Sequence, residues 1–126
     1  MTLAYVDTSY LAAISLGEQS APTLARRVAK FGEIVSSPLM EAELRATLIR
    51  ERRDLDEVLV GSVDWVLPNR PLTPEIARVL EAGYVRGADC FHLAAALYRA
   101  DNPAALTFLT LDARQRIVAK ALGFKT

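Results

Sequence analysis

The sequence predicts an α/β protein: a three-layer α/β/α sandwich around a central, mostly parallel sheet of four to five strands. Short apolar runs such as residues 3–6 and 106–110 alternate with longer segments of helical periodicity. That alternation is typical of a parallel sheet covered by helices on both faces. A chain of 126 residues can bury one core but not two, so we expect residues 1–126 to form a single domain.

The first elements are a strand and two helices. Leu-Ala-Tyr-Val at residues 3–6 is apolar throughout, as a buried first strand would be. Thr8 or Ser9 can cap the helix that follows, and Gly17 ends it. A second helix is expected over residues 21–31, with Gly32 after it as a C-cap.

A second strand and a long helix come next. Residues 33–36 predict a short strand, and Ser37-Pro38 opens the helix because proline is tolerated in a first turn. Four apolar residues recur at helical spacing and predict its buried face: Leu39, Ala42, Ala46 and Ile49. Asp54 or Asp56 then begins another helix.

The second half of the chain continues the alternation. In order, the sequence predicts a strand at 65–67, a helix at 73–84, a turn at 86–88, a helix at 89–100, a strand at 106–110, a helix at 113–122 and an edge strand near Phe124.

The composition narrows the function. Fifteen basic and fifteen acidic residues cancel, so a polyanion must be bound locally rather than by bulk charge. The apolar runs are far shorter than the roughly 20 residues of a membrane span, so we expect no membrane partner. The sequence shows no signal-peptide pattern at its start and has a single cysteine, Cys90, which together favour the reducing cytoplasm.

Four scattered acidic residues are the main functional signal. Asp7 and Asp112 follow predicted strands, and Glu43 and Asp89 lie in predicted first turns of helices. Open α/β sheets bind ligands at the carboxyl ends of their strands, where these side chains would meet. Clustered carboxylates repel unless a cation neutralises them, and oxygen ligands suit Mg²⁺. A metal site that hydrolyses nucleic acid is therefore expected.

Four motifs in order resemble the PIN-domain family, most closely its small VapC-type ribonuclease toxins. They are Val6-Asp7-Thr8-Ser9, Ser36-Ser37-Pro38 through Glu43-Leu44, Arg86 through Ala94, and Leu109-Thr110-Leu111-Asp112. The resemblance covers nearly the whole chain and implies a PIN-like sandwich. It further implies an endoribonuclease that needs Mg²⁺ (or Mn²⁺), a homodimer, an RNA substrate and a small antitoxin partner.

The resemblance also implies roles for residues. Its catalytic, metal-binding carboxylates fall on Asp7, Glu43, Asp89 and Asp112. Thr110 falls where the family places a ligand to water or metal, and Thr8 and Arg86 are further auxiliary candidates. Glu41, two residues from Glu43, is the alternative ligand. One acidic position of the family has no counterpart, because Gln115 and Arg116 occupy that region.

Each candidate also has a structural interpretation. Asp7, Asp89 and Asp112 could merely cap or stabilise helix N-termini, but a Glu inside a helix is not an N-cap, so Glu43 favours the metal site. The only histidine, His92, is interpreted as a buried hydrogen-bonding residue rather than a general base.

Three arginines near the motifs are candidates for contacts with the substrate. Arg86 is either a phosphate ligand or a solvated turn residue, whereas Arg114 and Arg116 are candidates for contacts with the substrate backbone.

Two other classes of function share part of this sequence pattern. A phospho-signalling domain or phosphatase also places Asp after its first strand, but a dehalogenase-type phosphatase has a second Asp where this chain has Ser9. A PIN domain that processes RNA, or a scaffold that binds RNA or protein without cutting, is the alternative within the same fold. The RNA target, its cleavage sequence and the number of metals are not decided by the sequence.

Overall fold

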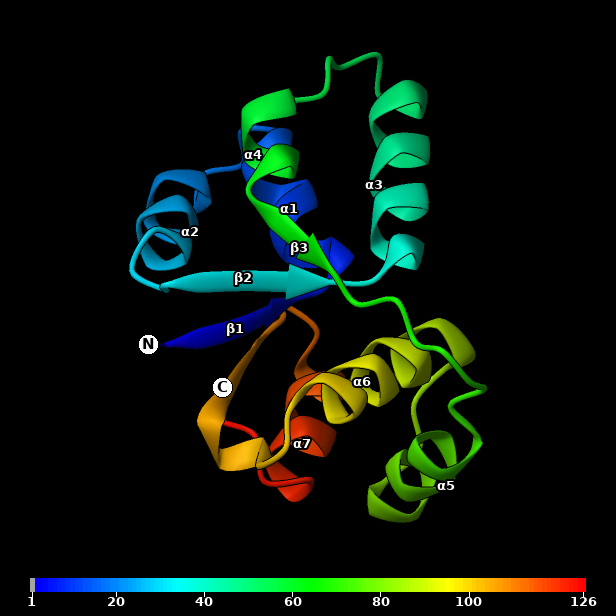
Figure 1. Ribbon diagram of the computed structural model, residues 1–126. Coiled ribbons are helices and arrows are strands. Elements are labelled where there is room, and N and C mark those ends of the chain that lie inside the picture. The colour runs from blue at the N-terminus through cyan, green and yellow to red at the C-terminus, as the bar shows by residue number, and fades with distance from the viewer. Residues whose placement is uncertain (1) are drawn as a thin grey trace.

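Four parallel strands form the centre of the molecule, in the order β3-β2-β1-β4 (Figure 1). The computed structural model describes residues 2–126. The strands are β1 (Leu3–Val6), β2 (Glu33–Ser36), β3 (Val63–Trp65) and β4 (Leu106–Leu109). Tyr5 of β1 lies opposite Val35 of β2 and Phe108 of β4. β1 is thus an inner strand, and its C-terminal end lies beside that of β4.

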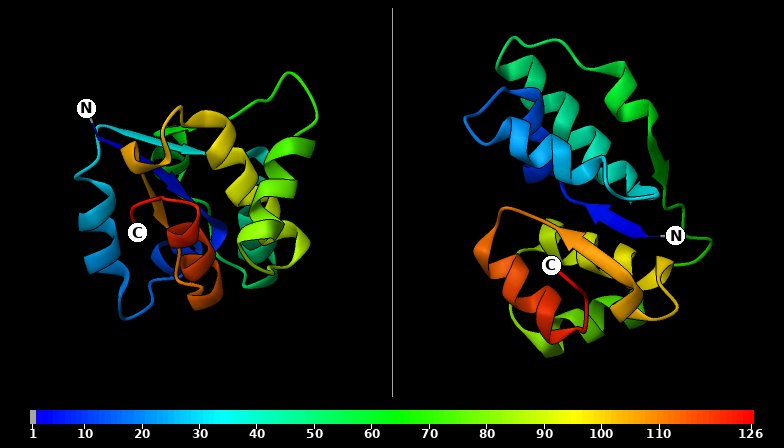
Figure 2. Two further views of the ribbon diagram at one scale, coloured as in Figure 1. Left: turned by 90° about the horizontal axis from the view of Figure 1, so that it is seen from below. Right: turned by 90° about the vertical axis from the view of Figure 1, so that its left-hand side faces the viewer.

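Helices cover the sheet on both faces, which confirms the predicted three-layer sandwich (Figures 1 and 2). One layer holds α1 (Thr8–Ser15), α2 (Ala21–Val28), α3 (Pro38–Arg50) and α4 (Glu57–Gly61). The other holds α5 (Thr73–Ala82), α6 (Gly87–Arg99) and α7 (Ala113–Ala121). The edge strand predicted near Phe124 is reduced to a single bridge between Thr107 and Lys125. Of the helices in residues 2–126, none is both long and apolar enough to cross a membrane.

The apolar run of β1 is explained by burial on both of its faces. Ala4 and Val6 pack into the cluster under α1–α4, whereas Tyr5 packs into the cluster under α5–α7. Successive side chains of a strand point to opposite faces, so a strand covered on two sides needs apolar residues at every position. The bounds of β1 and β2 match the prediction.

The buried face of α3 differs from the predicted one. Met40, Leu44 and Leu48 are the buried residues of this helix, and Ile49 is 78% exposed. Two apolar stripes run along α3: the predicted one, which ends at Ile49, and a second one of Met40, Leu44 and Leu48. α1 packs against α3 and buries the second stripe. Glu43, one residue before Leu44, therefore lies at the margin of the buried face and is half-buried.

Several element boundaries are also shifted. β3 begins two residues early because Val63 is buried opposite Ile34. Gly87 already belongs to α6, so the predicted turn at 86–88 lies earlier, in the loop that follows α5. α2 ends at Val28 with Ala29 as its C-cap, so Gly32 does not cap it. Of the two caps predicted for α4, Asp56 is the one observed.

Candidate active site

Asp7 lies at the point where β1 passes into α1. Its N–H donates to the Leu109 carbonyl at 3.1 Å, which continues the pairing of β1 with β4 by one residue. The carboxylate is the N-cap of α1: Oδ1 accepts from the Tyr10 N–H at 3.2 Å and from the Ser9 hydroxyl at 2.7 Å. The prediction of Thr8 or Ser9 as the cap was wrong, because both lie within the first turn. Asp7 is only 3% exposed, so its direction is fixed by these donors.

Thr110 joins the ends of β1 and β4. Its Oγ1 lies 2.6 Å from Asp7 Oδ2 and 2.9 Å from Gln115 Oε1, and it accepts from the Asp112 N–H at 3.0 Å. A hydroxyl has one hydrogen, so Thr110 donates to Asp7 or to Gln115 at any moment. Asp112 caps α7 by accepting from the Gln115 N–H at 2.8 Å. One buried hydroxyl therefore contacts the Asp7 carboxylate and the backbone of Asp112.

Gln115 is the residue of this region that sequence reasoning missed. It appeared only as the absence of an acidic residue, yet its side chain is fully buried. Nε2 donates to the Asp89 carbonyl at 3.2 Å while Oε1 faces Thr110, so the amide links α7, β4 and α6. The sequence signal that could have indicated Gln115 is its position in the first turn of a helix, three residues after the capping Asp112.

Glu43 reaches the same region from α3, where it lies in the second turn rather than the predicted first. Its Oε1 accepts from the Thr8 hydroxyl at 2.7 Å and lies 2.8 Å from His92 Nε2. His92 is 2% exposed and its Nδ1 lies 2.8 Å from the Tyr5 hydroxyl, which confirms the predicted hydrogen-bonding role. Glu41, by contrast, pairs with Arg45 at 2.9 Å on the surface.

Asp89 is the third residue of α6, two positions later than predicted. Burial raises the pKa of its carboxyl, and the negative charges of Asp112, Asp7 and Glu43 raise that pKa further. Burial likewise raises the pKa of Asp7, against the lowering effect of the Thr110 and Ser9 hydroxyls. The His92 and Thr8 hydrogen bonds lower the pKa of Glu43 despite its partial burial. Asp89 thus lies close enough to the other three carboxylates for their charges to act on it.

The donor set fits a hard divalent cation. Within the described part of the chain, the protein donors leave three candidates with a free oxygen: Glu43 Oε2, Asp112 Oδ2 and both oxygens of Asp89. Such carboxylates suit Mg²⁺, which keeps several waters and needs one or two protein carboxylates. Among residues 2–126, no three acidic, histidine or cysteine side chains lie close enough together to hold a metal ion between them. A cation there would therefore retain part of its water shell.

Two arginines accompany the acidic residues. Arg86 and Arg114 line a hollow of about 290 Å³ together with Asp89 and Asp112. Both cations can reach a phosphate that approaches the carboxylates, which is the arrangement needed to hold a polyanion in a chain of zero net charge. Arg116 is placed differently, because its guanidinium donates to the Thr110 carbonyl at 2.9 Å.

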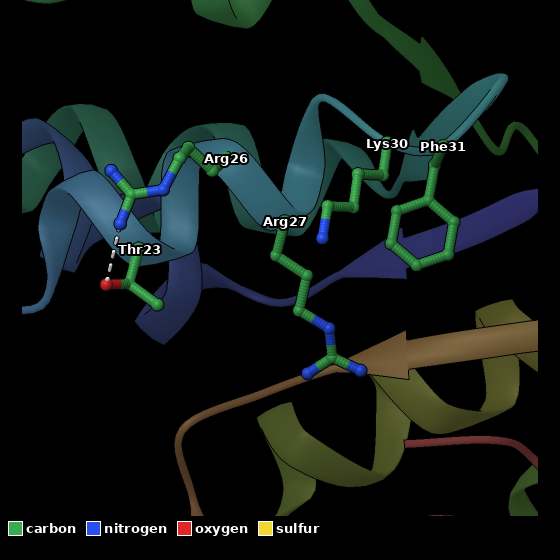
Figure 3. Close-up of a pocket in the computed structure, with 5 residues that line it drawn as sticks. All are labelled: Thr23, Arg26, Arg27, Lys30 and Phe31. Carbon is green, nitrogen blue, oxygen red and sulfur yellow. Dashed lines mark hydrogen bonds between the residues drawn. The ribbon is translucent and has the colours of Figure 1, made fainter.

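A second basic hollow, of about 390 Å³, lies along α2 (Figure 3). Arg26, Arg27, Lys30, Phe31 and Thr23 line it, and Arg26 donates to the Thr23 hydroxyl at 3.3 Å. It shares no lining residue with the hollow at Asp89 and Asp112. The negative end of the α2 dipole stabilises cations in its last turn, so this basic face has a structural cause of its own.

Comparison with known proteins agrees with this geometry. A family model described as the PIN domain matches residues 4–121, from β1 through α7, and so includes all four carboxylates. A search of curated proteins found no relative that matches. The chain therefore belongs to the PIN domain family, whose members are generally metal-dependent nucleases.

Proposed function

We propose that this protein is a Mg²⁺-dependent endoribonuclease, with Mn²⁺ as an effective substitute, and that it is the toxin of a type II toxin–antitoxin pair in the cytoplasm. The observation that supports the catalytic part is the effect of the Asp112, Asp7 and Glu43 charges on Asp89, which raises the pKa of its carboxyl beyond the effect of burial. Their mutual repulsion, expressed in the raised pKa of Asp89, is what a bound cation would relieve.

In this mechanism Asp89, Asp112 and Glu43 would hold the cation through their free oxygens, and Asp7 would add charge at the buried end. When bound, Mg²⁺ would supply a water of lowered pKa and would stabilise charge on the scissile phosphate. Thr110 favours the ionised form of Asp7 when it donates to Oδ2, and Thr8 anchors Glu43. Arg86 and Arg114, which line the same hollow as Asp89 and Asp112, would bind the phosphate.

The toxin assignment rests on the resemblance of the four motifs, and the surface supports it in one place. Next to α3 a hollow of about 180 Å³ is lined by Arg45, Leu48, Ile49, Arg53, Asp54 and Leu55. An antitoxin that inserts an apolar helix beside the first helices would cover this exposed apolar surface. We also propose that the protein is a homodimer, which sedimentation or size-exclusion chromatography would test.

The decisive test is cleavage of unstructured RNA by the purified protein with Mg²⁺, Mn²⁺ or EDTA. Asp7→Asn and Asp89→Asn are expected to abolish cleavage, and Asn at position 7 still caps α1. Asp64→Asn is the matched control, because Asp64 is an exposed acid on β3 outside the site. Glu43→Gln compared with Glu41→Gln separates the two candidate ligands.

The outcomes separate the alternatives. Undiminished cleavage in EDTA or by the Asp7 variant would refute the mechanism. RNA binding without any cleavage would favour the non-cutting scaffold. Cleavage without toxicity in cells, and without suppression by a co-expressed neighbouring protein, would favour a role in RNA processing.

A further inference from the structure

Three side chains from three elements form a hydrogen-bonded line from the core to Glu43. Tyr5 of β1 is fully buried, and its ring stacks on Phe108 with centroids 5.3 Å apart. Its hydroxyl lies 2.8 Å from His92 Nδ1, and His92 Nε2 lies 2.8 Å from Glu43 Oε1. The line begins in a rigid part of the core and ends on a carboxylate that is 35% exposed.

The hydrogens along this line can be assigned by counting donors and acceptors. An ionised Glu43 only accepts, so His92 Nε2 must carry a hydrogen. The Tyr5 hydroxyl lies 2.8 Å from His92 Nδ1, and the Ser36 and Ser37 side chains are also near it. A neutral imidazole with its hydrogen on Nε2 leaves Nδ1 as an acceptor. A tyrosine hydroxyl is protonated at neutral pH, so Tyr5 can donate to the bare Nδ1.

We propose that Tyr5 and His92 are positioning residues for metal binding: Tyr5 holds His92 as the tautomer with hydrogen on Nε2, and His92 holds Glu43 by Oε1. The inference rests on the proposed role of Glu43 as a metal ligand. Thr8 and His92 both donate to Oε1, and no donor in the described chain reaches Oε2. A long, half-buried side chain is thereby fixed in one orientation before a cation arrives.

The molecule offers two features that make this testable. His92 is the only histidine, so a protein labelled with ¹⁵N-histidine shows a single imidazole. Tyr10 supplies a matched control, because it is also a buried tyrosine, but its hydroxyl has no hydrogen-bond partner in the described structure. Tyr10→Phe therefore removes a buried hydroxyl without touching the line.

The first experiment records the imidazole ¹⁵N shifts of the metal-free protein at neutral pH. We expect one tautomer, with hydrogen on Nε2 and none on Nδ1. Tyr5→Phe should remove the hydrogen bond to Nδ1 and shift the ¹⁵N resonance of that atom, whereas Tyr10→Phe should keep the parental spectrum. A mixture in the parent protein, or an unchanged spectrum in Tyr5→Phe, would overturn the inference.

The second experiment measures Mn²⁺ affinity by calorimetry, without any substrate. Loss of an outer partner of a metal ligand typically weakens binding about 10–100-fold. We expect His92→Phe to fall in that range, Tyr5→Phe to lose roughly 3–10-fold and Tyr10→Phe to match the parent. His92→Gln, whose amide can still donate to Glu43, should recover part of the loss.

Glu43→Gln separates the two ways of failing. If this variant binds Mn²⁺ as the parent does, Glu43 is not a ligand, and both the assignment and the inference that rests on it are overturned. If Glu43→Gln weakens binding while Tyr5→Phe and His92→Phe do not, the ligand assignment stands and only the positioning inference is overturned.

Discussion

The Thr110 hydroxyl should contribute more to stability than a single surface hydrogen bond, and Thr110→Val isolates it because the two side chains have nearly the same shape. The substitution removes the donor that lies 2.6 Å from Asp7 Oδ2 and the acceptor of the Asp112 N–H. A hydrogen bond to a charged group contributes about 1.5–3 kcal/mol, and the second contact is half-exposed and adds little. We expect the free energy of unfolding to fall by about 2–3 kcal/mol at pH 7.

The assay is urea unfolding of the metal-free protein, with thermal melting as a second measure. For a domain of this size the expected loss lowers the melting temperature by roughly 10 °C. Thr110→Ser keeps the hydroxyl, so it should retain most of the stability and controls for the loss of the methyl group.

The cost should also depend on pH. The hydroxyl favours the ionised form of Asp7, so its contribution is present above the pKa of Asp7 and is lost as the pH falls through it. Burial raises that pKa, so the loss begins at a higher pH than for an ordinary aspartate. A Thr110→Val protein within about 0.5 kcal/mol of the parent at pH 7, or one with the same deficit at all pH values, would refute this reasoning.

Three further predictions concern other parts of the molecule. Asp89→Asn should raise the stability of the metal-free protein by about 0.5 kcal/mol at pH 7. The reason is that the pKa of Asp89 is raised, so its ionised form opposes folding. Thermal melting in EDTA at several pH values would test this, because the gain should vanish in acid, where Asp89 is protonated. Leu48→Ala should cost about 2–4 kcal/mol in urea unfolding while Ile49→Ala stays within about 0.5 kcal/mol, and equal costs would contradict the observed face of α3. Gly83→Ala should cost about 1–3 kcal/mol, because a Cβ there would meet Val118 Cγ2 at 2.9 Å, whereas Gly61→Ala meets nothing and should be neutral or stabilising by the same measurement.

The fold was predictable because local patterns and burial agree in most elements. β1 and β2 match their predicted bounds. In β1 all four residues are apolar, as expected for a strand that is buried on both faces. The face of α3 was not predictable in this way. Its two apolar stripes satisfy the same periodicity, and only the packing of α1 selects Met40, Leu44 and Leu48 over the stripe that ends at Ile49.

The positions of the candidate acidic residues at the strand ends could be predicted from the sequence, but the contacts that orient their side chains could not. The chain order of strands and helices was enough to expect Asp7 and Asp112 at one edge. The contact of His92 with Glu43 spans 49 residues, and that of Gln115 with the Asp89 carbonyl spans 26. Such contacts depend on side-chain geometry between helices, which leaves no local pattern in a single sequence.

The neighbouring positions of β1 and β4 set when the site can exist during synthesis. Thr110 meets Asp7 across 103 residues of chain, and every candidate carboxylate except Asp112 precedes it. A ribosome that is still translating this protein therefore carries a nascent chain whose first strand lacks its partner on one side. Until β4 leaves the exit tunnel and docks, Asp112 cannot join the other three acidic residues, and Asp7 lacks the Thr110 hydroxyl. The candidate site is therefore completed only near the end of synthesis.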